Sequence, residues 1–320
     1  MAVYTEVSDQ ELKSFVALYN IGEVQSCKGI AEGVENSNYL LQTTRGKYIV
    51  TLYEKRVSVR ELPFFLGLME HLALQNFFSP TPVRGRDGEL CRTLCEKLAA
   101  ITTFLPGSCP IKIAPSHCEQ LGIATAKMHL ATNGYNFERR NQLGRSGWSS
   151  LFGQVFDKAN NYELDLYNII REELVYLDRN WPSNLPKGII HGDLFPDNVF
   201  FQNELISGII DFYFACSGSY AYEIAICLNA WCFENDISFS VTKAKSLVKG
   251  YNSIRELNTQ ELAALPLLAR GSALRFLLTR LYDIIHHPTG ALVKPKDPLE
   301  YFKKLLFHQK ATGPSAYGLD

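Results

Sequence analysis

The chain has 320 residues, of which 46% are hydrophobic and 20% are charged. These proportions are typical of a soluble globular protein, and the length suits one large domain or two closely joined lobes. The 32 Lys and Arg residues are balanced by 33 Asp and Glu residues. Because there is no basic surplus to neutralise a phosphate backbone, the composition disfavours nucleic acid as a partner.

The remaining bulk features indicate a cytoplasmic protein without a membrane partner. The N-terminus carries no basic segment followed by an apolar stretch, and no uninterrupted apolar run approaches the roughly 20 residues of a membrane-spanning helix. The eight cysteines include no Cys-x-x-Cys pair, and most of them stand among apolar residues. We therefore expect reduced thiols that pack as small hydrophobic groups.

The first hundred residues predict a small lobe rich in strands. Apolar residues at helical spacing indicate a helix from Ser8 or Asp9 to about Tyr19, with the polar residue as its cap. The segments that follow alternate between strand and helix patterns. In chain order they are strands at 34–41 and 47–53, a helix at 59–77, and strands at 90–94 and 99–104.

Beyond Leu105-Pro106-Gly107 the pattern becomes mainly helical. Helices are predicted at 115–130, 149–179, 222–233, 241–251, 260–285 and 298–307, and one β-rich stretch interrupts them at 189–214. The sequence therefore predicts an α+β bilobal architecture. The nucleotide-binding lobe would span residues 1–103, and a larger catalytic and substrate-binding lobe would span residues 104–320.

The stretch from 188 to 211 contains the candidate catalytic and metal-binding residues. An apolar strand leads into His191-Gly192-Asp193, Asn198 follows five positions after Asp193, and Asp211 stands beyond what reads as a β-hairpin. Kinases need a carboxylate that accepts the proton of the attacking hydroxyl, together with oxygen ligands for Mg²⁺. Asp193 fits the first role, whereas Asn198 and Asp211 fit the second. Each could instead cap a turn, but the joint spacing favours catalysis.

The motif resembles that of the aminoglycoside phosphotransferase-like superfamily of small-molecule kinases, which share the bilobal protein-kinase-like fold. Within it the chain is similar nearly end to end to the homoserine kinases. This similarity is carried by segments such as Gly29–Tyr39, Leu52–Arg56, Phe104–Gly107, Arg140–Gly144 and Ala273–Asp283. It implies ATP as the donor, Mg²⁺ as the cofactor and transfer to the side-chain hydroxyl of L-homoserine in threonine biosynthesis.

The nucleotide site is predicted around the loop of residues 29–38. Gly29 and Gly33 would let backbone amides approach the phosphates, with polar support from Asn36, Ser37 and Asn38. The kinase strand lysine is missing, because Thr51 occupies its expected position. Lys47, Lys55 and Arg56 are nearby substitutes, although such residues are more often solvated charges at a strand end. We select Lys55, with Glu61 on the next helix as its candidate partner, and Glu61 could also be an ordinary surface residue.

An amino-acid acceptor needs a guanidinium for its carboxylate and an acidic or carbonyl group for its ammonium. Arg275 and Asp283 share a helix face, which suits such a ligand, although an ion pair within the fold explains them equally well. Glu223 could cap the helix from residue 222 or support the catalytic loop. Trp231 could form a wall of the pocket, although packing in the core is more common for such a residue. The acceptor-site residues that we select are Arg139, Arg140, Glu223, Trp231, Arg275 and Asp283.

Two other functions stay open from the sequence. The chain could phosphorylate choline, an aminoglycoside or a sugar, although the arginines of the second lobe favour an acceptor with a carboxylate. It could also be a non-catalytic scaffold, but degenerate kinases usually lose the catalytic Asp or a metal ligand. Asp193, Asn198 and Asp211 are all present, so activity is expected.

Overall fold

The computed structural model describes residues 5–30, 36–54, 60–159, 162–163, 165–235, 237–287 and 295–319. This part of the chain divides into two compact units. The first holds the described residues up to Gly107 together with Ser207–Tyr213, and the second holds the other described residues. The lobe boundary between residues 103 and 104 stays a prediction of the sequence.

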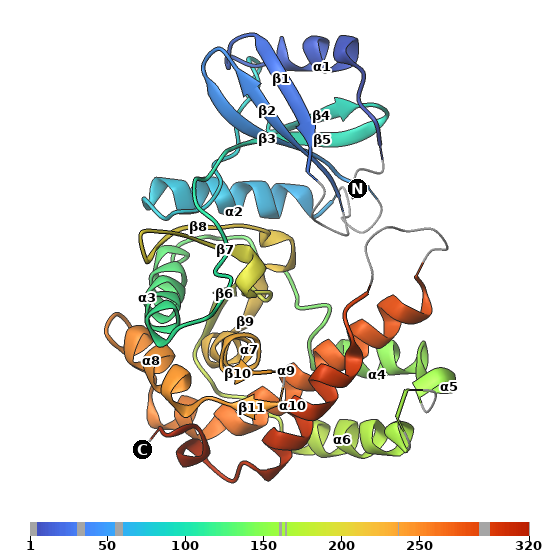
Figure 1. Ribbon diagram of the computed structural model, residues 1–320, viewed down its shortest axis with the longest axis vertical. Helices are drawn as coiled ribbons and strands as arrows, with labels where there is room; N and C mark the ends of the chain where they lie inside the picture. Colours follow the sequence, from blue (N-terminus) through green and yellow to red (C-terminus); the bar gives the residue numbers. More distant parts are fainter. Residues whose placement is uncertain are drawn as a thin grey trace. The chain divides into compact units, whose positions relative to one another are not determined.

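The first unit contains a five-stranded sheet in the order β1-β2-β3-β5-β4, with antiparallel neighbours throughout (Figure 1). The strands predicted at 34–41 and 47–53 are confirmed as β2 and β3, which pair with each other on either side of the turn at 43–46. β1 was not predicted. The elements of this unit are α1 (Asp9–Val16), β1 (Val24–Gly29), β2 (Ser37–Thr43), β3 (Gly46–Leu52), α2 (Leu62–Leu74), β4 (Cys91–Leu94) and β5 (Lys97–Thr103).

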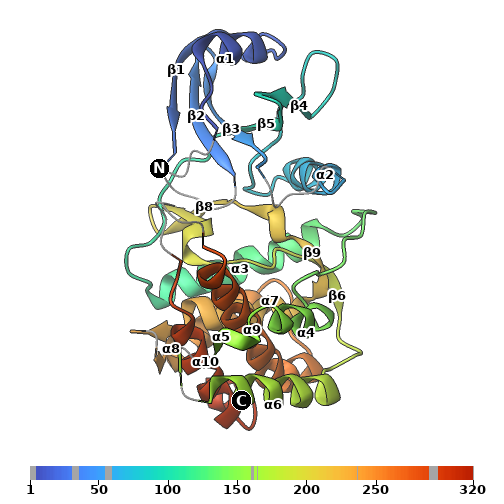
Figure 2. The same cartoon turned by 90° about the vertical axis from the view of Figure 1, so that its right-hand side faces the viewer.

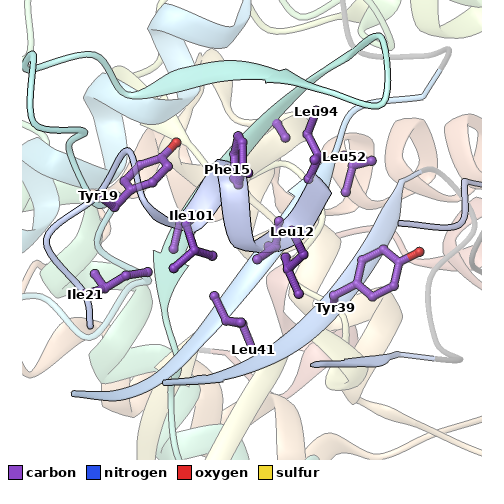
Figure 3. Close-up of a cluster of buried hydrophobic side chains, with 12 residues drawn as sticks. Leu12, Phe15, Tyr19, Ile21, Tyr39, Leu41, Leu52, Leu94 and Ile101 are labelled. Carbon is purple, nitrogen blue, oxygen red and sulfur yellow. The ribbon is translucent and has the colours of Figure 1, made fainter. Parts of the chain in front are cut away.

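The helix α1 covers one face of this sheet, and Figure 3 shows Leu12 and Phe15 directed at Leu41 and Ile101 of the strands. The helix begins where the sequence predicts, because Ser8 and Glu11 form a reciprocal capping box. It ends at Val16, three residues before the predicted end. The apolar stripe of α1 therefore closes the core of the first unit.

The second unit is built mainly of helices, with short strands that carry the catalytic segment. In it α9 packs against α7 and α10, and α3 packs against α8 (Figure 2). The elements are α3 (Pro115–Ala131), α4 (Arg145–Gly153), α5 (Phe156–Ala159), α6 (Leu166–Asn180), β6 (Lys187–Ile190), η1 (Pro196–Asn198), β7 (Val199–Gln202), β8 (Leu205–Ile209), η2 (Phe212–Phe214), β9 (Cys216–Ser219), α7 (Tyr220–Trp231), β10 (Phe233–Glu234), β11 (Ser238–Phe239), α8 (Val241–Asn252), α9 (Thr259–Ile285), α10 (Pro298–Lys310) and η3 (Pro314–Tyr317). The last residues of β8 and the first two of η2 belong to the first unit.

The strand pairing of the catalytic segment agrees with the predicted hairpin. β7 and β8 form a two-stranded sheet, and β6 pairs with β9 so that Ile190 lies opposite Cys216. β9 was not predicted from the sequence. It anchors the strand that leads into the catalytic loop.

One predicted helix is wrong. The sequence indicated a single helix at 149–179, but the structure has α4, α5 and α6 there. Gly153 ends α4, and Asp165 takes a left-handed φ of 63° immediately before α6. Helical periodicity continued through these breaks because apolar residues flank each of them.

The helix α9 is long and apolar enough to cross a membrane by length and composition alone. However, 67% of its apolar window is buried within the fold, as is usual for the central helix of a helical core. Its position between α7 and α10 explains this apolar character.

Candidate active site

The catalytic loop joins β6 to β7 and is held closed by Asn198. The Asn198 side-chain Nδ2 donates to the Asp193 carbonyl oxygen at 2.8 Å and to the Asp193 Oδ2 at 3.3 Å. Its backbone N–H donates to the Phe195 carbonyl at 3.0 Å. The structure therefore brings two of the predicted residues, Asp193 and Asn198, into direct contact, with Asp193 half-buried and Asn198 buried.

The loop rests on a buried carboxylate from α7. Glu223 is fully buried, and it accepts hydrogen bonds from the backbone N–H groups of His191 and Gly192, the latter at 3.1 Å. Farther along the same helix, the Trp231 indole donates to the Leu194 carbonyl at 2.8 Å. Trp231 is completely buried, so the structure supports its packing role, and it supports the loop-bracing role for Glu223.

Arg275 of α9 braces the loop from the other side. Its guanidinium donates to the Gly192 carbonyl and lies 4.4 Å from the Phe276 ring. Only 2% of Arg275 is exposed. Its charge therefore fixes the backbone that leads into Asp193, which is a contact within the fold that the sequence did not predict.

His191 and Gly192 set the backbone turn before Asp193. The buried His191 Nδ1 accepts the Asp193 backbone N–H at 3.2 Å, so this histidine has a structural role within the loop. Gly192 has a φ of +78°, and an added Cβ would lie 2.9 Å from the Phe214 carbonyl oxygen. Glycine is thus required at position 192 by both its backbone conformation and the lack of space for a Cβ.

Asn198 of the second unit and Asp211 of the first unit each carry an oxygen of the kind that Mg²⁺ binds, and their joint role as its ligands stays a prediction. Nδ2 of Asn198 is turned toward Asp193, and Oδ1 of the same amide is a neutral oxygen of the kind that Mg²⁺ takes as a ligand. Asp211 has a left-handed φ of 65°, a conformation that is uncommon for residues with a Cβ but that Asp adopts more readily than most. Mg²⁺ usually takes few protein ligands and completes its shell with water and phosphate. An amide oxygen and a carboxylate fit that preference.

The first unit places the predicted polar residues of the nucleotide loop against β3. Asn36 Oδ1 accepts the Glu54 backbone N–H at 3.3 Å, Ser37 donates to the Glu54 carboxylate at 2.6 Å, and Asn38 Oδ1 accepts from Thr51 at 2.7 Å. Each side chain thus fixes the start of β2 to the end of β3. Their predicted contact with nucleotide stays a prediction.

The other predicted nucleotide residues are placed only in part. Gly29 ends β1, and Glu61 stands directly before α2, where its carbonyl accepts from the first turn. Gly33 and Lys55 lie outside the described residues. Sequence reasoning missed a cation here, because Lys97 of β5 forms an ion pair with Glu54. Only the antiparallel pairing of β3 with β5 reveals this neighbour.

Aromatic residues link the Asp211 segment to the sheet of the first unit. The Tyr213 hydroxyl lies 3.2 Å from that of Tyr53, and its ring lies 5.7 Å from Phe65 of α2. Burial raises the pKa of Tyr213 to about 12, and the Asp211 carboxylate also raises it. The Tyr213 phenol is therefore neutral and stands close to Asp211. The sequence offered no signal for this contact.

The remaining acceptor residues lie in different environments. Arg139 donates to the Ala215 carbonyl at 3.3 Å, and Arg140 is exposed and bridges to Ser217 at the edge of β9. Asp283 is half-buried on α9. These three residues stay predictions. Burial raises the pKa of the Cys216 thiol, and the charges of Arg275 and Arg139 act in the opposite direction.

The comparisons with known proteins decide the family. Residues 26–257 match the model of the phosphotransferase enzyme family. A homoserine kinase from Paramagnetospirillum magneticum is 57% identical over 326 residues and covers 100% of both chains. One from Rhodospirillum rubrum is 55% identical over 319 residues, covering 100% of this chain and 99% of that protein. The chain belongs to the homoserine kinases of this phosphotransferase family.

Solved structures of other kinases share the fold at low sequence identity. An amicoumacin kinase aligns with a TM-score of 0.69 and 18% identity, over 95% of this chain and 92% of that chain. A choline kinase from Cryptosporidium parvum aligns with a TM-score of 0.66 and 15% identity, over 95% of each chain. These likenesses confirm the predicted kinase-like fold class.

Proposed function

We propose that the protein transfers the γ-phosphoryl group of ATP to the side-chain hydroxyl of L-homoserine, giving O-phospho-L-homoserine for threonine biosynthesis. The observation that carries this proposal is full-length identity of 54–57% to homoserine kinases. The intact catalytic loop supports activity rather than a scaffold role. We also propose that the protein acts in the cytoplasm, as expected for a metabolic enzyme, and that ATP and homoserine are its small-molecule partners.

Asp193 is the general base of the proposed reaction. Its backbone is fixed by His191 and its side chain by Asn198, so the carboxylate is oriented before the acceptor binds. It would orient the attacking hydroxyl and accept its proton as the phosphoryl group departs from ADP. Such proton transfer typically contributes 10²–10⁴-fold to the rate.

Asn198 and Asp211 would hold Mg²⁺, which neutralises developing phosphate charge when it is bound. The assignment rests on their ligand chemistry, on the orientation of the Asn198 amide and on the motif spacing. Gly29, Gly33, Asn36, Ser37 and Asn38 are proposed to cover the phosphates. Lys55, paired with Glu61, is proposed as the cation that binds phosphate. It would replace the strand lysine of other kinases, whose position is occupied by Thr51.

A panel of acceptors tests the function. With Mg²⁺ and ATP, kcat/KM for L-homoserine should exceed that for L-serine, choline and kanamycin. Turnover of choline or kanamycin well above homoserine would overturn the proposed acceptor. Asp193→Ala should lower kcat by about 10²–10⁴-fold while ATP binding persists, whereas Asp211→Ala should abolish Mg²⁺-dependent nucleotide binding. The Asp193 and Asp211 roles fail if the two variants behave alike.

A further inference from the structure

An ion pair on the catalytic loop is not used by the proposed chemistry. Asp197 of η1 and Lys296, just before α10, pair at 3.0 Å between Oδ2 and Nζ although they are 99 positions apart. The Lys296 ammonium also lies 5.3 Å from the centroid of the Phe195 ring. A cation and an anion from two distant segments therefore meet within the loop that carries Asp193 and Asn198.

Stability does not explain this pair. The Lys296 and Asp197 side chains are 59% and 61% exposed, and an exposed pair typically contributes only about 0–1 kcal/mol. The backbone on each side is nevertheless fixed by the fold. Arg280 donates to the Asp297 carbonyl at 2.7 Å, and the Cys109 thiol donates to the Asp197 carbonyl at 3.3 Å. Two opposite charges are thus held in place but left accessible.

The neighbouring cations are occupied within the fold. Arg275 holds the Gly192 carbonyl, Arg280 pairs with Glu300, and Lys304 donates to the Asn229 carbonyl at 2.9 Å and to Glu300. All three side chains are buried. Lys296 differs from them because, among the residues that the structure describes, it pairs with an exposed carboxylate and is itself exposed.

We propose that Asp197 and Lys296 are the recognition pair for the zwitterionic end of the amino-acid acceptor. This inference rests on the proposed homoserine kinase function. The acceptor's α-carboxylate would replace Asp197 at the Lys296 ammonium, and its α-ammonium would replace Lys296 at the Asp197 carboxylate. Each charged side chain would therefore exchange its present partner for a ligand group of the same charge, so that neither charge is left unpaired.

The presence of Asp197 distinguishes this role from phosphate binding. A lone lysine beside a kinase loop could hold a nucleotide phosphate, but a carboxylate 3.0 Å away would repel a polyanion. A ligand with both charges uses both residues. Asp193 and Asp197 also belong to the same short loop, four positions apart, so the reacting hydroxyl and the zwitterionic end of one small ligand are assigned to neighbouring residues.

The test compares Lys296→Gln and Asp197→Asn with the unmodified protein. Each substitution should raise KM for L-homoserine about tenfold or more, as expected for loss of one charge-assisted hydrogen bond, while KM for ATP changes less than twofold. Lys249→Gln is the matched control. Lys249 forms an exposed pair with Glu119 at 2.9 Å, and its loss should leave both constants unchanged.

Competitive inhibitors separate the two charges. Lys296→Gln should weaken inhibition by a hydroxyl-free amino acid, L-2-aminobutyrate, but not by 2-aminobutanol, which lacks the carboxylate. Asp197→Asn should weaken both. The proposed role of the pair would be overturned if KM rose for ATP instead of L-homoserine, or if both KM values were unchanged in both variants. If the unmodified protein does not phosphorylate homoserine, the proposed function itself fails.

Discussion

Gly192 is the residue whose replacement is most constrained in the catalytic loop. Its φ of +78° is unfavourable for any residue with a Cβ, and the new atom would meet the Phe214 carbonyl at 2.9 Å. A left-handed conformation alone costs an L-residue roughly 1–2 kcal/mol. The same geometry sets the direction of the Asp193 backbone, so stability and activity depend on it together.

We predict that Gly192→Ala lowers the free energy of unfolding by about 2 kcal/mol or more and lowers kcat. Urea unfolding followed by circular dichroism measures the first effect. Gly153→Ala at the end of α4 is the control, because no atom lies within 4 Å of its added Cβ. Equal stability of the two variants would show that the left-handed turn is not a constraint.

At the residue scale, the sequence predicts that Asp193 and Asn198 share one loop and offers Glu223 as a support for it, but it gives no signal that Arg275 contacts the loop backbone. The spacing of Asp193 and Asn198 is local, so the loop that joins them could be predicted. The roles of Glu223 and Arg275 depend on which way two helices face after packing. Both were selected as acceptor residues, and the structure shows each of them bonded to the loop backbone.

At the scale of elements, α7 and α9 position the catalytic loop. Glu223 and Trp231 are eight residues apart on α7, so they share one face of the helix, and Arg275 approaches from α9. Backbone N–H groups that meet a buried carboxylate make charge-assisted hydrogen bonds, which are stronger than neutral ones. The loop is therefore ordered by charge as well as by packing.

Glu223→Gln should destabilise the fold by about 2–3 kcal/mol, because an amide cannot accept from both backbone donors with both atoms. It should also lower kcat more than KM, since the loop loses its support. Unfolding and steady-state kinetics of Glu223→Gln and the surface variant Glu119→Gln give the comparison. The bracing role is wrong if the two behave alike.

Helix and strand prediction failed where pattern and packing diverge. β1 is an edge strand without regular burial alternation, so periodicity gave no signal for it. The segment 149–179 kept its apolar spacing across three separate helices. By contrast, α1 with its Ser8 cap and the β2–β3 turn were predictable, because caps and tight turns are encoded locally.

For the whole molecule, two buried histidines tie stability to pH. Burial lowers the pKa of both His129 and His308, the latter to about 3. His308 is kept neutral between Asn229 Oδ1 at 3.0 Å and the Tyr317 hydroxyl at 2.8 Å. An unfolded histidine has a pKa near 6.5, so between these values the unfolded chain binds more protons. Their stabilising contribution is complete above about pH 6.5 and declines as pH falls.

We predict that the free energy of unfolding falls below pH 6.5, with about 1.4 kcal/mol per pH unit arising from His308. In His308→Gln this slope should shrink by that amount between pH 6 and pH 5, although the variant is less stable at pH 7. His287→Gln, at an exposed position, should keep the original slope. Urea midpoints at three pH values measure it, and an unchanged slope in His308→Gln would contradict the account.

The central claim concerns the atom that receives the phosphoryl group. The most direct measurement is ³¹P and ¹H NMR of the product formed from L-homoserine, ATP and Mg²⁺. We predict a phosphomonoester coupled to the side-chain methylene protons, formed by the unmodified protein and reduced by about 10²–10⁴-fold in rate with Asp193→Ala. The account would be contradicted if homoserine stayed unphosphorylated after incubation with ATP and Mg²⁺. It would also be contradicted if the Asp193→Ala variant formed the product at the same rate as the unmodified protein.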